Sequence, residues 1–174
     1  IRNEIEASDS SYDKEKLQER AAKLAGGVAV LRVGAPTEVE LKEKKHRVED
    51  ALSATQAAVD EGILAGAGTS FIRAMSAVDR VHKELTGDEA VGARIVRDAL
   101  PVPLRQIAVN SGETGDVIVQ RVADATGAMG YNGSDGKIAD LTKVGVVDPT
   151  KVVRAALQNA GSVATMVLST ETLI

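Results

Sequence analysis

Residues 36–62 read PTEVELKEKKHRVEDALSATQAAVDEG, and this stretch decides the fold class. Thr37 and Glu40 stand at the spacing of a helix capping box, and Gly62 is a residue that commonly ends a helix. The residues that lie along one stripe between these ends are Val39, Val48, Leu52, Thr55 and Val59. The pattern predicts a helix over 37–61, longer than the average globular helix of about 11–12 residues. Such a long, charged helix suits a connecting element.

Before this helix, the chain has the pattern of another helix, followed by a short apolar run. A helix is expected from Ser10 or Ser11 to about Ala25, where Gly26 and Gly27 stop it. Residues 28–33 are apolar and rich in β-branched side chains, and glycines bound them. This pattern predicts a buried strand.

The chain after the helix opens with a glycine-rich break, Gly62-Ile-Leu-Ala-Gly-Ala-Gly68. Helical patterns follow at 69–85, 88–100, 104–109 and 116–123, then a turn or hairpin at 127–136 and a helical turn at 140–144. A last helix is expected to begin at Asp148-Pro149, with Asp148 as the N-cap, and to end near Leu168. The predicted fold class is therefore mainly α with a few short strands (α+β).

The composition of the sequence argues against several classes of function and partner. The 174 residues are 44% hydrophobic, yet they include only one Phe, two Tyr and no Trp. The formal charge of −4 argues against a nucleic-acid partner, which needs a basic face. The absence of cysteine excludes disulfides and favours an intracellular, cytoplasmic protein. No apolar run has the roughly 20 residues that span a bilayer, so no membrane partner is expected.

Three features could carry chemistry, and each also has an ordinary structural interpretation. Glu49-Asp50 could position a water that attacks phosphorus, or could be a solvated helix face. The Gly62–Gly68 loop before a helix could approach an anion, or could simply separate two helices. Tyr131-Asn132-Gly133 and Asp148 could recognise a nucleoside, or could be turn and cap residues. The two histidines, His46 and His82, show no metal-ligand pattern, and these residues alone leave the function open.

The sequence resembles the group I (Hsp60 or GroEL-type) chaperonins over essentially its whole length. Four blocks in the first part carry the likeness: Tyr12–Arg20, Ala22–Val30, Val33–Glu40 and Lys42–Leu52. Pro103–Ile107, Gly130–Asn132 and Asp148–Lys151 continue it in order. The resemblance implies that residues 1–26 are the last apical-domain helices. It also implies that 27–61 are an intermediate-domain segment, a strand plus the long helix, and that 62–174 are the C-terminal half of an equatorial ATPase domain.

The resemblance also implies roles for individual residues. Asp50 matches the catalytic carboxylate of the intermediate helix. The positions that match nucleotide-binding residues are Gly66, Ala67, Asn132, Gly133, Val146 and Asp148, where Val146 packs on the base and Asp148 bonds the ribose. Ala67 replaces a glycine of the family. Glu38 and Arg105 match contacts between subunits, although Thr114 replaces the acid expected near the second of these.

The expected function is that of a piece of an ATP-dependent chaperonin, which assists protein folding inside a double-ring cage. ATP and Mg²⁺ would serve the complete subunit, whose partners would be other subunits in heptameric rings, a co-chaperonin and unfolded polypeptides. The family's phosphate-binding Gly-Asp-Gly-Thr-Thr-Thr loop is not in this sequence, so we expect the chain alone to have little or no affinity for ATP and to be inactive. Without the other half of the equatorial domain, the apolar faces of Thr69–Leu85 and Pro149–Leu168 would be exposed, so we also expect the chain to self-associate. The alternative is a free-standing scaffold module that dimerises through the helix at 37–61.

Overall fold

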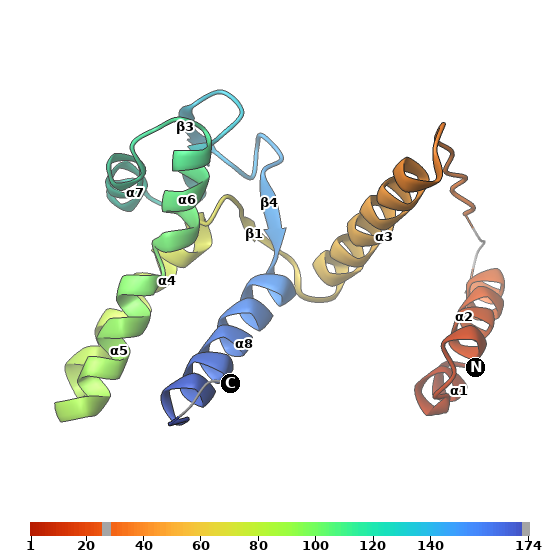
Figure 1. Cartoon of the computed structure of the whole chain (residues 1–174), viewed down its shortest axis with the longest axis horizontal. Coiled ribbons are helices and arrows are strands. Elements are labelled where there is room, and N and C mark those ends of the chain that lie inside the picture. Colours follow the sequence, from red (N-terminus) through yellow and green to blue (C-terminus); the bar gives the residue numbers. More distant parts are fainter. Residues whose placement is uncertain (26–28, 172–174) are drawn as a thin grey trace. The chain divides into compact units, whose positions relative to one another are not determined.

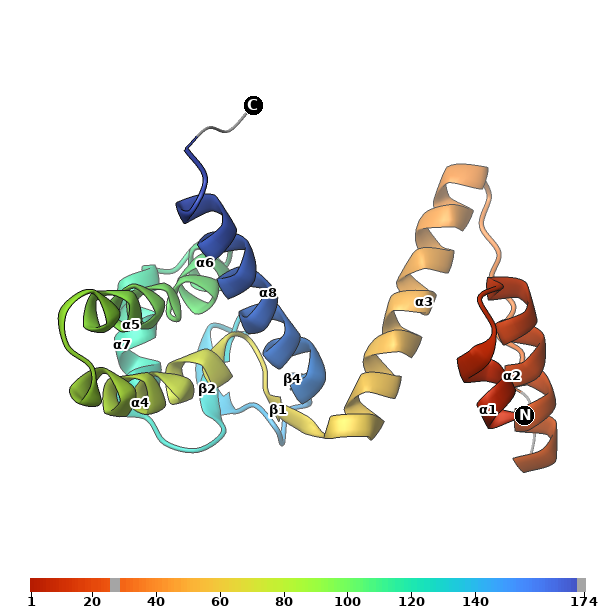
Figure 2. The same cartoon turned by 90° about the horizontal axis from the view of Figure 1, so that it is seen from below.

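The computed structural model describes residues 1–25 and 29–171, and the chain divides into two compact units, 1–48 and 49–174. Most of the described residues are helical, and the strands are short (Figure 1). This confirms the mainly α fold class. The first unit holds α1 (Arg2–Ala7), α2 (Ser11–Ala25) and the first half of α3 (Glu38–Glu61). In it, α1 packs against α2 (Figure 2).

The start of α3 follows the predicted cap. The backbone N–H of Glu40 donates a hydrogen bond to Thr37 Oγ1 at 3.3 Å, which satisfies one of the donors left free at a helix N-terminus. At the other end Gly62 has a φ of +82°, a left-handed conformation that glycine adopts without steric cost. The long helix at 37–61 is therefore confirmed.

The strand predicted over 28–33 is wrong for residues 29–33, which are not part of any strand in the structure. Val28 and the predicted helix stop at Gly26 and Gly27 lie outside the described residues. A strand needs a hydrogen-bonded neighbour, and no strand in the described part of the chain pairs with this segment. The apolar pattern shows that residues 29–33 are able to form a strand. It does not show whether a neighbouring strand is present to pair with them.

The second unit is a helical layer with two small sheets. It contains α4 (Thr69–Glu84), α5 (Gly87–Ala99), α6 (Val102–Asn110), α7 (Gly115–Asp124) and α8 (Thr150–Leu168). Helices α4 and α5 pack side by side, as do α6 and α7 (Figures 1 and 2). These helices match the predicted ones within a few residues at their ends.

Both sheets have two antiparallel strands. In one sheet β1 (Ile63–Ala65) pairs with β4 (Val147–Pro149), and in the other β2 (Met129–Asn132) pairs with β3 (Lys137–Asp140). The second sheet confirms a hairpin about the turn expected at 127–136, but its second strand runs on to Asp140. The helical turn predicted at 140–144 is therefore wrong at its start, because Asp140 is in β3, and the turn that follows is not part of a helix. The first corrects the prediction for Asp148, which lies in a strand while Pro149 is the N-cap of α8. The pairing of β1 with β4 joins residues far apart in sequence, so local turn chemistry did not reveal it.

The core lies where α4, α6, α7 and β2 meet. Its buried members are Ile72, Leu104, Ala108, Ile118, Val122 and Tyr131. All except Tyr131 are aliphatic, which agrees with the composition. Arg73 fixes the edge of this core because its guanidinium donates hydrogen bonds to the carbonyls of Val122, Gly127 and Met129 at 2.8, 3.0 and 2.8 Å.

Candidate functional site

The candidate site begins at the loop Gly66-Ala67-Gly68, which joins β1 to α4. Ala67 and Gly68 both adopt left-handed backbone conformations, with φ of +53° and +74°. The N–H of Thr69 donates to the carbonyl of Gly66 at 3.0 Å and closes the turn. A methyl group at Gly68 would lie 2.8 Å from the backbone nitrogen of Leu104, so the loop runs directly against the start of α6. Glycine is required there by both conformation and space.

The two strands bring three predicted residues together. Leu64 pairs with Asp148 in the β1–β4 register, and the N–H of Gly66 donates to the carbonyl of Val146 at 3.0 Å. A methyl group at Gly66 would lie 3.1 Å from that same oxygen, so the two backbones approach closely. Gly66, Val146 and Asp148, predicted to serve one ligand, thus belong to one backbone cluster.

Asp148 is the titratable group of this cluster. Its side chain is half-buried, and burial raises the pKa of the carboxyl above its usual value. Burial without a compensating cation disfavours the charged form. A carboxylate in such a position can accept hydrogen bonds from hydroxyl groups of a ligand, which would stabilise its charged form.

Asn132 and Gly133 lie at the end of β2 and in the turn of the hairpin. Asn132 Oδ1 accepts a hydrogen bond from the N–H of Ser134 at 3.1 Å, and the Asn132 carbonyl accepts one from Gly136 at 3.0 Å. A methyl group at Gly133 would lie 2.9 Å from Ser111 Oγ at the end of α6. The oxygen of the Asn132 amide therefore shapes the turn, while its NH₂ group is the part that could donate to a ligand.

The hairpin is connected to the cluster through Leu141, which is fully buried. The N–H of Val146 donates to the carbonyl of Leu141 at 2.8 Å, and the N–H of Leu141 donates to Ala128 at 3.0 Å. A methyl group at Gly130 would lie 2.6 Å from the Leu141 side chain and 2.1 Å from Thr69 Oγ1. The loop, the hairpin and the turn before β4 therefore share one tightly packed support.

The other predicted residues lie outside this cluster. Asp50 is exposed along α3. Glu38 forms an ion pair with Lys42 at 2.7 Å, and Arg105 forms one with Asp116 at 2.7 Å. Of the two predicted subunit contacts, Glu38 is exposed and Arg105 is partly exposed, and both are paired within the chain. In the described part of the sequence, no group of three or more His, Asp and Glu side chains could hold a metal ion.

Residues 7–174 match the model of the TCP-1/cpn60 chaperonin family. The chain belongs to this family. The structure of this chaperonin chain also resembles the open-state monomer of a group II chaperonin from Methanococcoides burtonii, with a TM-score of 0.64 and 22% sequence identity. The match covers 77% of the present chain and 35% of that protein, so this chaperonin chain spans about a third of its relative.

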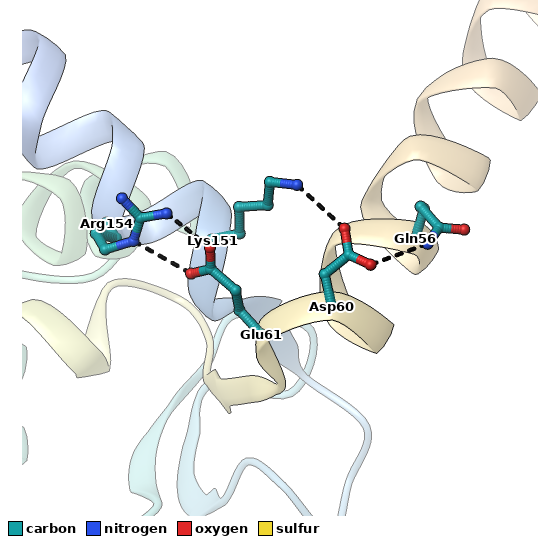
Figure 3. A network of polar contacts seen from close by, with 5 residues as sticks. All are labelled: Gln56, Asp60, Glu61, Lys151 and Arg154. Atoms are coloured by element: carbon teal, nitrogen blue, oxygen red, sulfur yellow. Dashed lines mark hydrogen bonds and ion pairs between the residues drawn. The ribbon is translucent and has the colours of Figure 1, made fainter. Parts of the chain in front are cut away.

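The chaperonin chain also has a polar joint that the sequence reading missed, where the end of α3 meets the start of α8 (Figure 3). Asp60 bonds to Lys151 at 3.1 Å and to Gln56 at 3.0 Å. Glu61 receives two hydrogen bonds from Arg154, at 2.6 and 3.2 Å. Hydrogen bonds from these cations lower the pKa values of both carboxyls.

A signal for this joint was present in the sequence. Acidic residues at a helix C-terminus and basic residues at a helix N-terminus both oppose the helix dipole. Asp60 and Glu61 end one helix of this chaperonin chain, and Lys151 and Arg154 begin another. When the two helix ends meet, the acidic pair at the end of one helix compensates the basic pair at the start of the other.

Among the described helices, none is both long and apolar enough to cross a membrane.

Proposed function

We propose that the chain supplies the C-terminal part of a group I, ATP-dependent chaperonin subunit that assists the folding of other proteins. The observation that carries this proposal is the β1–β4 pairing, because it gathers Gly66, Val146 and Asp148 from two distant parts of the sequence. The blocks at 12–20 and 42–52 favour group I. The family match supports a chaperonin in general.

In this proposal the cluster binds the nucleoside part of ATP. The backbone of Gly66 and Ala67 lies against the nucleotide, Val146 packs on the base, and the Asp148 carboxylate accepts hydrogen bonds from the ribose. The donor set fits such a ligand, since Asp148 is half-buried with a raised pKa and a hydroxyl donor would stabilise its charged form. Asn132 and Gly133 contribute the edge of the site nearest the adenine.

The phosphate end of the ligand needs residues from elsewhere in the subunit. The described residues offer no cluster of ligands for Mg²⁺, so the magnesium and phosphate contacts are assigned to the segment that carries the family's phosphate-binding loop. Hydrolysis of ATP bound with Mg²⁺ would supply the free energy of the folding cycle. Asp50 would then orient the attacking water once α3 brings it over the phosphates.

The proposed partners are other subunits in heptameric rings, a co-chaperonin and unfolded polypeptides, in the cytoplasm. Glu38 and Arg105 would exchange their exposed ion pairs within the chain for contacts between subunits, a change that costs little because exposed pairs contribute weakly. The chain alone is expected to self-associate. Its apolar groove of about 360 Å³ between α5 and α8, lined by Val96, Leu100 and Leu157 among others, supports this expectation.

A fluorescent-ATP titration tests the nucleotide assignment. The chain alone should give a signal near background, and a mixture with a polypeptide that supplies the phosphate-binding half should bind. Asp148→Ala should weaken binding by the mixture about tenfold or more, because a hydrogen bond to a charged group is lost. Asp135→Ala, at an exposed carboxylate of the hairpin turn, is the matched control. Tight binding by the chain alone that survives Asp148→Ala would contradict the assignment.

The second candidate function is a scaffold module that dimerises through α3. It is favoured by the exposure of Val39, Leu52 and Val59 on this helix. Leu52→Glu should dissociate such a dimer in sedimentation experiments. The same change should leave the oligomeric state unaltered if self-association uses the groove beside α8.

A further inference from the structure

The turn between β2 and β3 contains an asparagine followed directly by a glycine, Asn132-Gly133. The chain has four asparagines, at positions 3, 110, 132 and 159, and Asn132 is the one that precedes a glycine. Asn132 is the last residue of β2, and residues 133–136 form an exposed turn. A Cβ on the residue after an asparagine crowds the peptide nitrogen between the two, and glycine has no Cβ. The peptide nitrogen of Gly133 is therefore sterically open.

The side chain of Asn132 is folded back over this turn. Its Oδ1 accepts a hydrogen bond from the N–H of Ser134 at 3.1 Å. The ring of atoms that this bond closes runs through the peptide nitrogen of Gly133, so the bond holds the amide carbon, Cγ, beside that nitrogen. A donor on Oδ1 also stabilises negative charge that develops on this oxygen when a nucleophile attacks Cγ.

The N–H of Gly133 has no acceptor, whereas its neighbours in the turn are bonded. It donates no hydrogen bond to another residue in the described part of the chain. By contrast, Gly136 donates to the carbonyl of Asn132 at 3.0 Å, and Lys137 donates to Asp135 Oδ1 at 3.2 Å. An exposed turn of this kind opens locally at a small cost in free energy. Adjustment of the backbone about Gly133 therefore leaves the core intact.

We propose that Asn132-Gly133 is a site of spontaneous deamidation. The Gly133 nitrogen attacks Cγ of Asn132 and loses its proton, the bond from Cγ to Nδ2 breaks, and the side-chain nitrogen leaves as ammonia. This produces a cyclic imide. Water then opens the imide at one of its two carbonyls, which leaves an aspartate or an isoaspartate at position 132. One water is consumed for each ammonia released, and the reaction takes place within one chain.

The modification changes the chemistry of the candidate site. It replaces the NH₂ group of Asn132, a donor, by a carboxylate oxygen, which is an acceptor only. The isoaspartate product also adds an atom to the backbone between β2 and the turn. The effect on ATP rests on the proposed function, in which this NH₂ group lies at the adenine edge, whereas the modification itself does not.

Peptide mapping of the aged chain tests the site directly. Trypsin cuts after Lys and Arg, so residues 106–121, 122–137 and 155–174 form three peptides that each contain one asparagine. The full chain is incubated at mildly alkaline pH and digested. Mass spectrometry should show that the peptide with Asn132 changes from amide to acid several-fold faster than the peptides with Asn110 and Asn159. Equal rates in the three peptides would overturn the proposal.

The same measurement in guanidinium chloride shows whether the folded turn permits the reaction. The unfolded chain gives the rate of a free Asn-Gly sequence at the same pH. The rate at Asn132 in the folded chain should lie within about tenfold of it, because the opening of an exposed turn costs little free energy. A folded chain that reacts far more slowly than this would show that the turn protects Asn132, and would contradict the proposal.

A pair of variants isolates the role of Gly133. A methyl group at Gly133 would lie 2.9 Å from Ser111 Oγ, so both chains carry Ser111→Ala to leave room for it. S111A should react at the rate of the parent chain, and S111A/G133A should react several-fold more slowly, because the added Cβ crowds the attacking nitrogen. The pair is also compared in guanidinium chloride, where differences in folding have no effect. An unchanged rate in S111A/G133A would contradict attack by the Gly133 nitrogen.

A binding measurement separates the modification from its consequence. Asn132→Asp carries the charge of the product, and it should weaken fluorescent-ATP binding by the mixture of this chain with the phosphate-binding half. Rapid deamidation together with full binding by Asn132→Asp would support the modification and count against the role of Asn132 at the adenine. Absence of deamidation at Asn132, with weakened binding by Asn132→Asp, would overturn the modification and leave the proposed function standing.

Discussion

Glu61 at the end of α3 accepts two hydrogen bonds from Arg154 in the second turn of α8, at 2.6 Å from Nη2 and 3.2 Å from Nε. The two side chains come from elements separated by most of the second unit in sequence. The same junction holds a backbone bond from the N–H of Thr150 to the carbonyl of Gly62 at 3.0 Å. The helix that carries Asp50 is therefore tied at its base to the helix that follows Asp148.

Breaking this tie should loosen the junction while the core stays folded. Arg154→Ala removes both hydrogen bonds to Glu61, and hydrogen exchange at the Thr150 amide should accelerate a few-fold, because exposed ion pairs contribute modestly. Arg94→Ala, at an exposed arginine paired with Asp98, is the control. An unchanged Thr150 exchange rate in Arg154→Ala would show that the backbone pairing alone holds the junction.

The same junction should depend on pH in a defined direction. Cations lower the pKa values of Asp60 and Glu61 below 3.8 and 4.5, so folding gains stability from them above these values. This contribution is lost as the pH falls through the lowered pKa values. The protection factor of the Thr150 amide, which is corrected for the intrinsic pH dependence of exchange, should therefore fall in acid more in the parent chain than in Arg154→Ala. Identical acid profiles would contradict the assignment.

Asp148 should affect the stability of the fold with the opposite dependence on pH. Burial raises the pKa of its carboxyl above 3.8, so its effect favours folding at low pH and is lost as the pH rises through the raised value. Asp148→Asn should consequently leave the chain equally or more stable at pH 7, as judged by its melting temperature. The same change should reduce nucleotide binding in a complete subunit. A marked loss of stability at pH 7 would indicate a structural role for the charge.

Arg73 should be a strong determinant of stability in the second unit. Its guanidinium satisfies three carbonyls near the end of α7, so Arg73→Ala should lower the free energy of unfolding by roughly 2–4 kcal/mol in urea denaturation. Arg80→Ala, at an exposed position on the same helix, should change it by less than about 0.5 kcal/mol. Similar losses in both variants would contradict this role.

Two glycines offer a matched test of the packing beneath the candidate site. Gly130→Ala would place a methyl group 2.1 Å from Thr69 Oγ1, and we expect a loss of about 1–3 kcal/mol or more. Gly161→Ala in α8 meets nothing within 4 Å and should stabilise the chain by roughly 0.5–1 kcal/mol. Chemical denaturation of both variants measures the contrast, and an unaffected Gly130→Ala chain would mean that this support can yield.

The sequence allowed prediction wherever local chemistry was sufficient. The Thr37 cap, the glycine after Glu61 and the apolar spacing of α4 to α8 depend on neighbouring residues, and these elements were correctly predicted. Residues 29–33 and Asp148 were misassigned because strand formation depends on distant partners. The glycine loop that contains Gly66 was a candidate from its own residues, whereas a role for Val146 was suggested only by resemblance to a family. Their meeting across β1 and β4 could be seen only in the structure.

The measurement that tests the central proposal most directly is phosphate release from ATP, by the chain alone and by the chain mixed with a polypeptide that supplies the phosphate-binding half of a chaperonin. We predict background release from the chain alone, and release from the mixture that Asp50→Ala abolishes. If the chain alone releases phosphate and Asp50→Ala abolishes that release, the claim that another polypeptide supplies the phosphate-binding half of the site is contradicted. Release from the mixture that persists in Asp50→Ala would contradict the role of this carboxylate.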